Sequence, residues 1–92
     1  MNQISKKDVK YLFDAILSLD NLEQCEAFFE DVCTIKEIYS MAQRFTVAKL
    51  LKNGKTFNEI VEETGASSAT ISRVNRALNY GKGYKAILEK QK

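Results

Sequence analysis

The segment TFNEIVEETGASSATISRVNRALN, residues 56–79, constrains the fold more than any other part of this chain. Thr56 followed by Glu59 is the signature of a helix N-terminus, and Ser67 can cap a second helix. Between them, Gly65 stands where a tight turn needs a positive φ, which glycine adopts without a Cβ penalty. This spacing predicts a helix-turn-helix, a motif whose second helix fits the major groove of DNA.

The apolar residues of this segment fall where the two helices would pack together. Thr64 occupies an inward position, and Val61 stands where small residues are usual because the helices approach closely. We expect the crossing to widen slightly at Val61 or the extra volume to be absorbed locally. The four remaining inward positions are all apolar: Ile60, Ala66, Ile71 and Val74.

The outer face of the second helix carries side chains suited to nucleic acid. Small residues let a helix enter a groove deeply, hydroxyls and arginines bind base edges or phosphates, and a helix N-terminus attracts phosphate oxygens. Ser67 and Ser68 can equally serve only as caps, and Arg76 can be an ordinary solvated side chain. The predicted DNA contacts are Ser67, Ser68, Ala69, Thr70, Ser72, Arg73 and Arg76 on this helix, flanked by Lys52, Lys55, Asn58 and Lys82.

The composition favours one all-α domain of 92 residues. The chain is 45% hydrophobic, too apolar for a disordered protein, and it contains no proline. Residues 1–40 hold four Lys/Arg and eight Asp/Glu, a net charge of −4, whereas residues 41–92 hold ten and four, a net charge of +6. This asymmetry indicates either a second half that faces a polyanion or simply a solvated surface.

Six helices are expected from apolar periodicity and capping residues. The start signals are Ser5 for the first, Asp20 with Glu23 for the second, and Thr34 with Glu37 for the third, about residues 35–52, which Asn53 and Gly54 end. A short last helix, residues 84–90, follows the glycine loop at 81–83. The first three helices have the apolar stripes Val9, Leu12, Phe13, Ile16, Leu17; Leu22, Cys25, Phe28, Phe29, Val32; and Ile38, Met41, Ala42, Phe45, Ala48, Leu51.

The stripes of the first two helices are wider than a helix-turn-helix unit can cover. We interpret residues 1–53 as dimerisation helices, although the stripes can also complete the core of a monomer.

Several kinds of site are not expected in this sequence. It has no histidine, which removes imidazole catalysis and histidine metal sites, and it shows no targeting or membrane-spanning segment. Cys25 and Cys33 are eight positions apart, too far for a disulfide within one helix, and are expected to be buried thiols of a reducing, cytoplasmic setting. We therefore predict a protein that is not an enzyme and that needs no metal or cofactor.

The stretch AQRFTVAKLLKNGKTFNEIVEETGASSATISRVNRALNYG resembles the Trp repressor superfamily, most closely its Trp-repressor-related YerC/YecD-type members. The similarity is best over residues 33–84 and extends over almost the whole chain. It implies a six-helix subunit in an intertwined homodimer, with two helix-turn-helix units presented to successive major grooves of a palindromic operator. The expected function is a sequence-specific transcriptional regulator, a repressor; the alternative is a protein-interaction module on the same scaffold.

The resemblance also bears on a small-molecule effector. In the Trp repressor, tryptophan binds between the second helix of the motif and the central helix. Arg73 matches one arginine that stacks on the indole, and Arg44 is the nearest match to the other, although an ungapped alignment places Gln43 there. Val74 replaces a glycine and Ala77 a serine that border the ligand. The added bulk and the lost hydroxyl imply that this protein does not use tryptophan as co-repressor.

Overall fold

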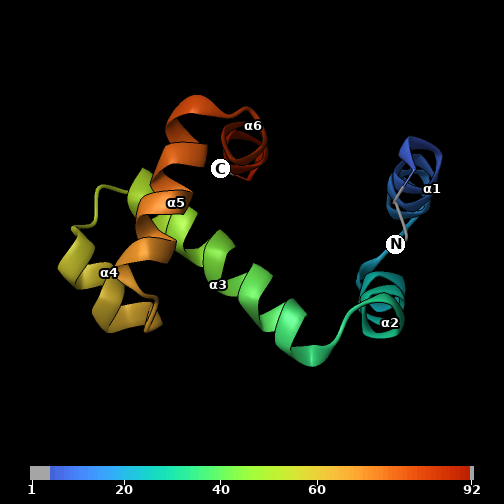
Figure 1. Cartoon of the computed structure of the whole chain (residues 1–92), viewed down its shortest axis with the longest axis horizontal. Coiled ribbons are helices and arrows are strands. Elements are labelled where there is room, and N and C mark those ends of the chain that lie inside the picture. The colour runs from blue at the N-terminus through green and yellow to red at the C-terminus, as the bar shows by residue number, and fades with distance from the viewer. Residues whose placement is uncertain (1–4, 92) are drawn as a thin grey trace. The chain divides into compact units, whose positions relative to one another are not determined.

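The computed structural model of the chain describes residues 5–91, which form six α-helices and no strand (Figure 1). The all-α, six-helix expectation is thereby confirmed. The chain divides into two compact units, one ending at Ile35 and the other beginning at Lys36. The helices are α1 (Lys6–Leu17), α2 (Leu22–Val32), α3 (Ile35–Lys52), α4 (Phe57–Thr64), α5 (Ser68–Tyr80) and α6 (Gly83–Lys90).

The helix starts of the first unit follow local capping chemistry. The hydroxyl of Ser5 accepts a hydrogen bond from the Asp8 amide at 3.0 Å, as its position predicts. The prediction that Asp20 caps α2 is wrong, because the side chain of Asn21 accepts from the Gln24 amide at 2.9 Å instead. Asn and Asp are equally good caps, so two of them in succession leave the start of a helix ambiguous by one residue.

Neither α1 nor α2 has a buried residue in the single chain. Leu17 is 83% exposed and Leu22 is 71% exposed. Phe28 and Phe29 are half-buried and meet edge to face, with ring centroids 5.6 Å apart. The apolar stripes therefore lie on these helices as predicted but remain largely uncovered.

The two cysteines are free and half-buried. Cys33 lies just beyond the last residue of α2, in extended backbone, so the helix does not hold both thiols. The expected burial of the thiols is only partial within one chain, because the stripe on which they lie has little cover there.

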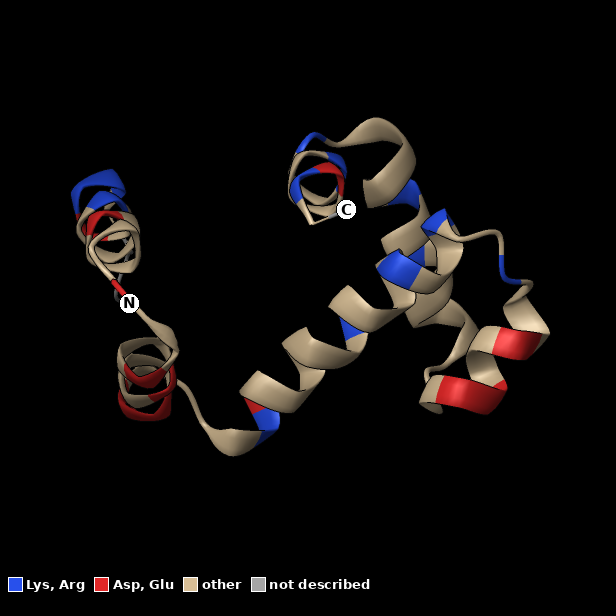
Figure 2. Cartoon of the chain, turned by 180° about the vertical axis from the view of Figure 1, so that it is seen from behind, with Lys and Arg blue, Asp and Glu red and all other residues tan. Residues whose placement is uncertain are grey.

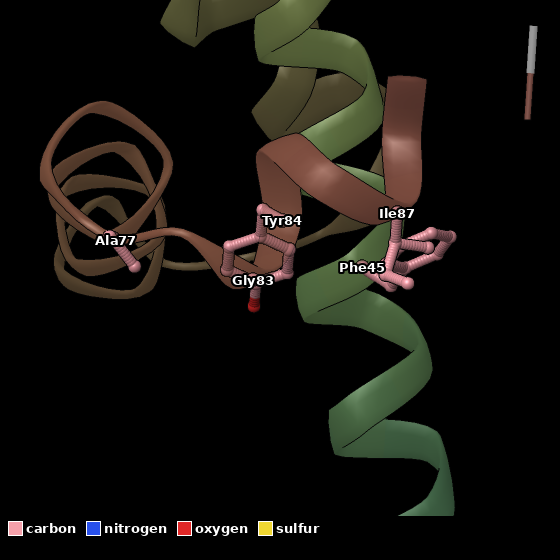
Figure 3. Close-up of a pocket in the computed structure, with 6 residues that line it drawn as sticks. Phe45, Ala77, Gly83, Tyr84 and Ile87 are labelled. Carbon is pink, nitrogen blue, oxygen red and sulfur yellow. The ribbon is translucent and has the colours of Figure 1, made fainter. Parts of the chain in front are cut away.

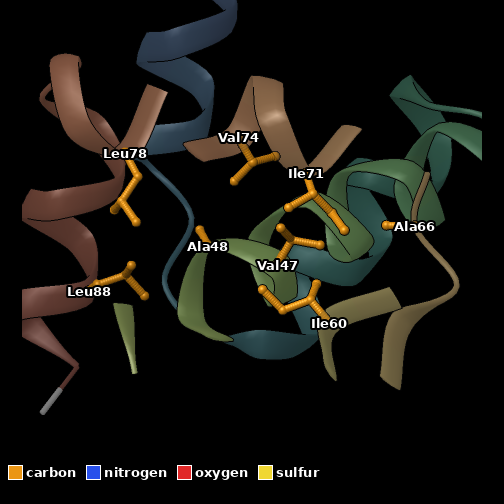
Figure 4. Packing of buried hydrophobic residues seen from close by; sticks show 8 residues of the cluster. All are labelled: Val47, Ala48, Ile60, Ala66, Ile71, Val74, Leu78 and Leu88. Carbon is orange, nitrogen blue, oxygen red and sulfur yellow. The ribbon is translucent and has the colours of Figure 1, made fainter. Parts of the chain in front are cut away.

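The core of the second unit lies where α3 meets the α4–α5 pair and α6 (Figure 4). The inward positions predicted for the helix-turn-helix are confirmed, since Ile60 and Ile71 have no exposed surface and Val74 has 2%. The apolar face predicted for α3 is partly wrong: Val47 is fully buried, whereas Met41 and Ala42 are exposed. The buried cluster consists of Val47, Ala48, Ile60, Ala66, Ile71, Val74, Leu78 and Leu88.

Local signals set the ends of α3, α4 and α5. Gly54 and Gly65 have φ of +84° and +70°, the left-handed conformation that lets the chain turn sharply after α3 and α4. Thr56 and Glu59 form the predicted capping box. A Cβ added at Gly81, which caps the C-terminus of α5, would lie 2.7 Å from the carbonyl oxygen of Ala77, so this junction requires glycine.

Candidate nucleic-acid interface

The buried side of α5 determines which side chains face solvent. Ile71, Val74 and Leu78 pack into the core, and a step of 100° per residue then turns Ser72, Arg73 and Arg76 outward. All the predicted contact residues of α5 and its cap are exposed except Thr70, which is half-buried. We call the exposed set Ser67, Ser68, Ala69, Ser72, Arg73 and Arg76 the reader face.

The reader face is positively charged without compensation. The helix α5 contains two arginines and no acidic residue, and within residues 5–91 neither guanidinium forms an ion pair. The acidic residues of the helix-turn-helix lie on α4, where Figure 2 shows them in red. A guanidinium that no carboxylate neutralises is available to a phosphate or to a guanine base.

The N-terminus of α5 is built as the sequence predicts. The hydroxyl of Ser67 accepts from the Thr70 amide and lies 3.1 Å from the Thr70 hydroxyl. Ser67 is therefore a cap, whatever else it contacts. The first amides of α5 have no hydrogen-bond partner within the helix. They therefore place a partial positive charge at its N-terminus, beside Ser67 and Ser68.

The flanking residues predicted to contact DNA are all exposed. Lys55 lies in the turn between α3 and α4, Asn58 in the first turn of α4, and Lys82 directly before α6. The sequence analysis did not single out Lys85, whose ammonium group donates to the carbonyl oxygen of Asn79 at 3.2 Å. This exposed bond joins the last turn of α5 to the first turn of α6.

A second unpredicted contact connects α3 to the motif. The Nε2 atom of Gln43 donates to the carbonyl oxygen of Thr64, the last residue of α4, at 3.0 Å. No sequence signal marks this bond, since its partners are 21 positions apart and meet only through packing.

An apolar hollow of about 470 Å³ lies among α3, the end of α5 and α6 (Figure 3). The rings of Phe45 and Tyr84 stack there with centroids 6.4 Å apart. The lining residues are Phe45, Ala77, Gly81, Gly83, Tyr84 and Ile87. Since almost all of the lining is carbon, the hollow favours an apolar occupant over a charged one.

Comparison of the sequence with models of known protein families identifies the family of this chain. The sequence model described as Trp repressor protein matches residues 7–92. The chain belongs to the Trp repressor family.

Relatives and solved structures agree with that assignment. The uncharacterized protein YerC of Bacillus subtilis (strain 168) is 50% identical over 93 residues, covering 100% of this chain and 89% of its own. A TrpR-like protein from Eubacterium eligens ATCC 27750 has a TM-score of 0.90 at 56% identity over 94% of this chain and 90% of its own. A candidate Trp repressor from Staphylococcus aureus has a TM-score of 0.89 at 49% identity, with coverages of 95% and 88%. The predicted resemblance is confirmed over almost the whole chain.

Of the residues matched to the tryptophan pocket of the Trp repressor, Ala77 lines the apolar hollow, whereas the others do not. Arg44 and Arg73 are exposed, and Val74 is packed in the core. The side chain of Gln43 is occupied by its bond to Thr64.

Residues 5–91 contain neither a candidate metal site nor a candidate membrane-spanning helix. No three His, Cys, Asp or Glu side chains gather as metal ligands would, and no helix has the length and apolar character needed to cross a membrane.

Proposed function

We propose that the protein is a sequence-specific DNA-binding transcriptional regulator, a repressor, that acts as a homodimer on a palindromic operator. The observation that carries the proposal is the reader face: two arginines without an ion-pair partner among residues 5–91, on a helix that has no acidic residue and packs on an apolar core. Membership of the Trp repressor family supports the same reading. Phosphate contacts would supply much of the affinity, and the arginines of α5 would read bases.

The exposed apolar surface indicates a binding partner, and we propose that this partner is a second copy of the chain. No residue of α1 or α2 is fully buried within one chain, and the hollow beside α6 is open and apolar. Covering a leucine or phenylalanine side chain stabilises an assembly by about 1.5–3 kcal/mol. We propose that the partner copy covers these surfaces and that the dimer presents two reader faces.

Tryptophan is not the co-repressor in this proposal. Val74 occupies core volume, and Gln43 donates to the carbonyl oxygen of Thr64. Isothermal titration of the protein with tryptophan should show no binding at micromolar concentrations. Heat of binding with a micromolar dissociation constant would contradict this part of the proposal.

Selection of bound duplexes from a random DNA pool tests the main proposal. The expected result is a palindrome whose half-sites lie about one helical turn, or roughly 10 base pairs, apart. Affinity for that site should fall steeply as salt increases from about 50 to 200 mM. Protein binding releases counterions from the DNA phosphates, and this release is less favourable at higher salt concentration. Recovery of no preferred sequence, together with binding that salt does not weaken, would reject the proposal.

A further inference from the structure

The buried contact between α3 and the helix-turn-helix is apolar. Figure 4 shows Val47 of α3 among Ile60 of α4 and Ile71 of α5, all without exposed surface. Apolar burial holds helices together but has little directional preference. A hydrogen bond loses strength when its angle departs from linearity, so a polar contact across this interface restricts orientation.

The bond from Gln43 to Thr64 supplies such a restriction. Its acceptor is the carbonyl of the last residue of α4, one of the groups that a helix C-terminus leaves without a partner inside the helix. The donor comes from α3, half-buried and one helical turn before Val47. The end of α4 is thus attached to α3 at a second point, apart from the apolar core.

Thr64 also forms hydrogen bonds within α4 and with the turn that follows it. Its hydroxyl donates to the carbonyl oxygen of Ile60 at 2.7 Å and accepts from the Ala66 amide at 3.1 Å. The same residue therefore bonds to α3, to α4 and to the segment that leads into α5. Ser67, the cap of α5, is only three positions further along the chain.

We propose that Gln43 is a positioning residue that fixes the orientation of the helix-turn-helix on α3, so that the reader face is aligned with DNA without a bound ligand. This inference rests on the proposed function for its consequence in DNA binding but not for its geometry. Specific binding needs α5 at one angle in the groove, whereas non-specific binding to phosphates tolerates a range of angles. Loosening the restraint lowers the fraction of molecules that are competent for specific binding and reduces apparent affinity by that fraction.

The test replaces the donor without adding charge. Gln43→Met keeps the length of the side chain but cannot donate, and Gln91→Met makes the same change at an exposed position of the C-terminal cap of α6. Competition against random-sequence duplex gives the ratio of specific to non-specific affinity. We expect this ratio to fall about three- to tenfold in Gln43→Met, the effect of losing one hydrogen bond, and to stay unchanged in Gln91→Met.

Residual dipolar couplings of the DNA-free protein provide a readout that does not depend on the proposed function. In the wild type, amides of α3 and α5 should fit one alignment tensor; in Gln43→Met, couplings of α4 and α5 should change or shrink relative to α3. Couplings that superimpose in the two proteins would overturn the role of Gln43, as would an unchanged specificity ratio. A wild type that selects no DNA site rejects only the proposed function, since the couplings still test the restraint.

Discussion

Arg76 lies on the exposed side of α5 and has no carboxylate partner among residues 5–91. Arg76→Ala should weaken binding to the selected operator by about 1–3 kcal/mol if the guanidinium reads a base, and Arg73→Ala should behave similarly. Fluorescence anisotropy with labelled duplex at fixed salt measures the effect. Both variants should unfold like the wild type within about 0.5 kcal/mol, since exposed side chains contribute little to stability.

A cation outside the reader face gives the control for the arginines. Lys6→Ala removes a positive charge from α1, where no DNA contact is proposed. Equal losses of affinity in Lys6→Ala and Arg76→Ala would show that only total charge matters, and would argue against base reading by α5.

Glu59 makes the stability of α4 sensitive to pH. The Thr56 amide donates to the Glu59 carboxylate, and this backbone bond, with a smaller contribution from the Thr56 side chain, holds the pKa of Glu59 below the usual glutamate value. A group whose pKa is lowered by folding stabilises the protein above its unfolded pKa, and this contribution disappears as pH falls through the folded pKa. We expect unfolding in urea between pH 7 and about pH 3 to show this loss in the wild type but not in Glu59→Gln.

Glu62 serves as the matched control for that measurement. It is an exposed carboxylate on the same helix and lies outside the capping box. Glu62→Gln should keep the acid-dependent loss seen in the wild type. If Glu59→Gln and Glu62→Gln follow the same pH profile, the capping box does not contribute to acid sensitivity.

At the scale of the helices, Ile71 is the residue that most directly holds α5 in place. It has no exposed surface and lies beside Val47 and Ile60 in the core. Ile71→Ala should lower the free energy of unfolding by about 2–5 kcal/mol through lost burial and the cavity left behind. Val61→Ala, at a position 43% exposed, should cost far less. Similar urea midpoints for the two variants would show that the α4–α5 contact is not the stabilising core.

The junction between α5 and α6 depends on Gly81. A methyl group there meets the Ala77 carbonyl oxygen at 2.7 Å, so Gly81→Ala must displace backbone and should destabilise the protein by about 1–3 kcal/mol. Gly83→Ala meets nothing within 4 Å and should be neutral or slightly stabilising, because alanine favours a helix. Thermal unfolding compares the two variants, and equal melting temperatures would show that the close approach at Gly81 is not rigid.

The sequence predicts those elements whose signals are local. The Thr56–Glu59 capping box, the positive φ of Gly65 and the cap at Ser67 each need only a few adjacent residues, and all three are observed. Asp20 was placed one residue too early because Asn21 beside it caps equally well.

Features that arise from packing could not be predicted in this way. The helix α3 is apolar on several sides, so periodicity did not show that Val47 faces the core while Met41 remains exposed. The bond from Gln43 to Thr64 also forms only once α3 and α4 are packed together. Reader-face exposure was predicted because the buried residues of α5 follow a single helical stripe, but the DNA contacts themselves stay predictions.

At the scale of the whole molecule, the buried residues are unevenly distributed between the two units, and this indicates a partner for the first unit. Among residues 5–91, all the buried residues lie between Val47 and Leu88, and the first unit contributes none of them. The first unit also carries the acidic excess and the second the basic one, so the surface of α1 and α2 proposed for dimerisation differs in charge from the reader face. A substitution on α1 is therefore expected to disturb assembly without altering the reader face.

Leu17→Glu tests the assembly. The side chain is 83% exposed in the single chain, so a charge there should leave the folded chain intact but should be unfavourable once a partner covers it. We expect sedimentation equilibrium at micromolar concentration to show a dimer for the wild type and a shift toward monomer for Leu17→Glu. Lys7 is nine positions before Ile16 and so lies opposite the middle of the apolar stripe of α1; Lys7→Glu should therefore remain dimeric. Because the palindrome is bound by two reader faces, Leu17→Glu should also lose affinity for the full operator while keeping its affinity for a half-site; a wild type that sediments as a monomer would contradict both expectations.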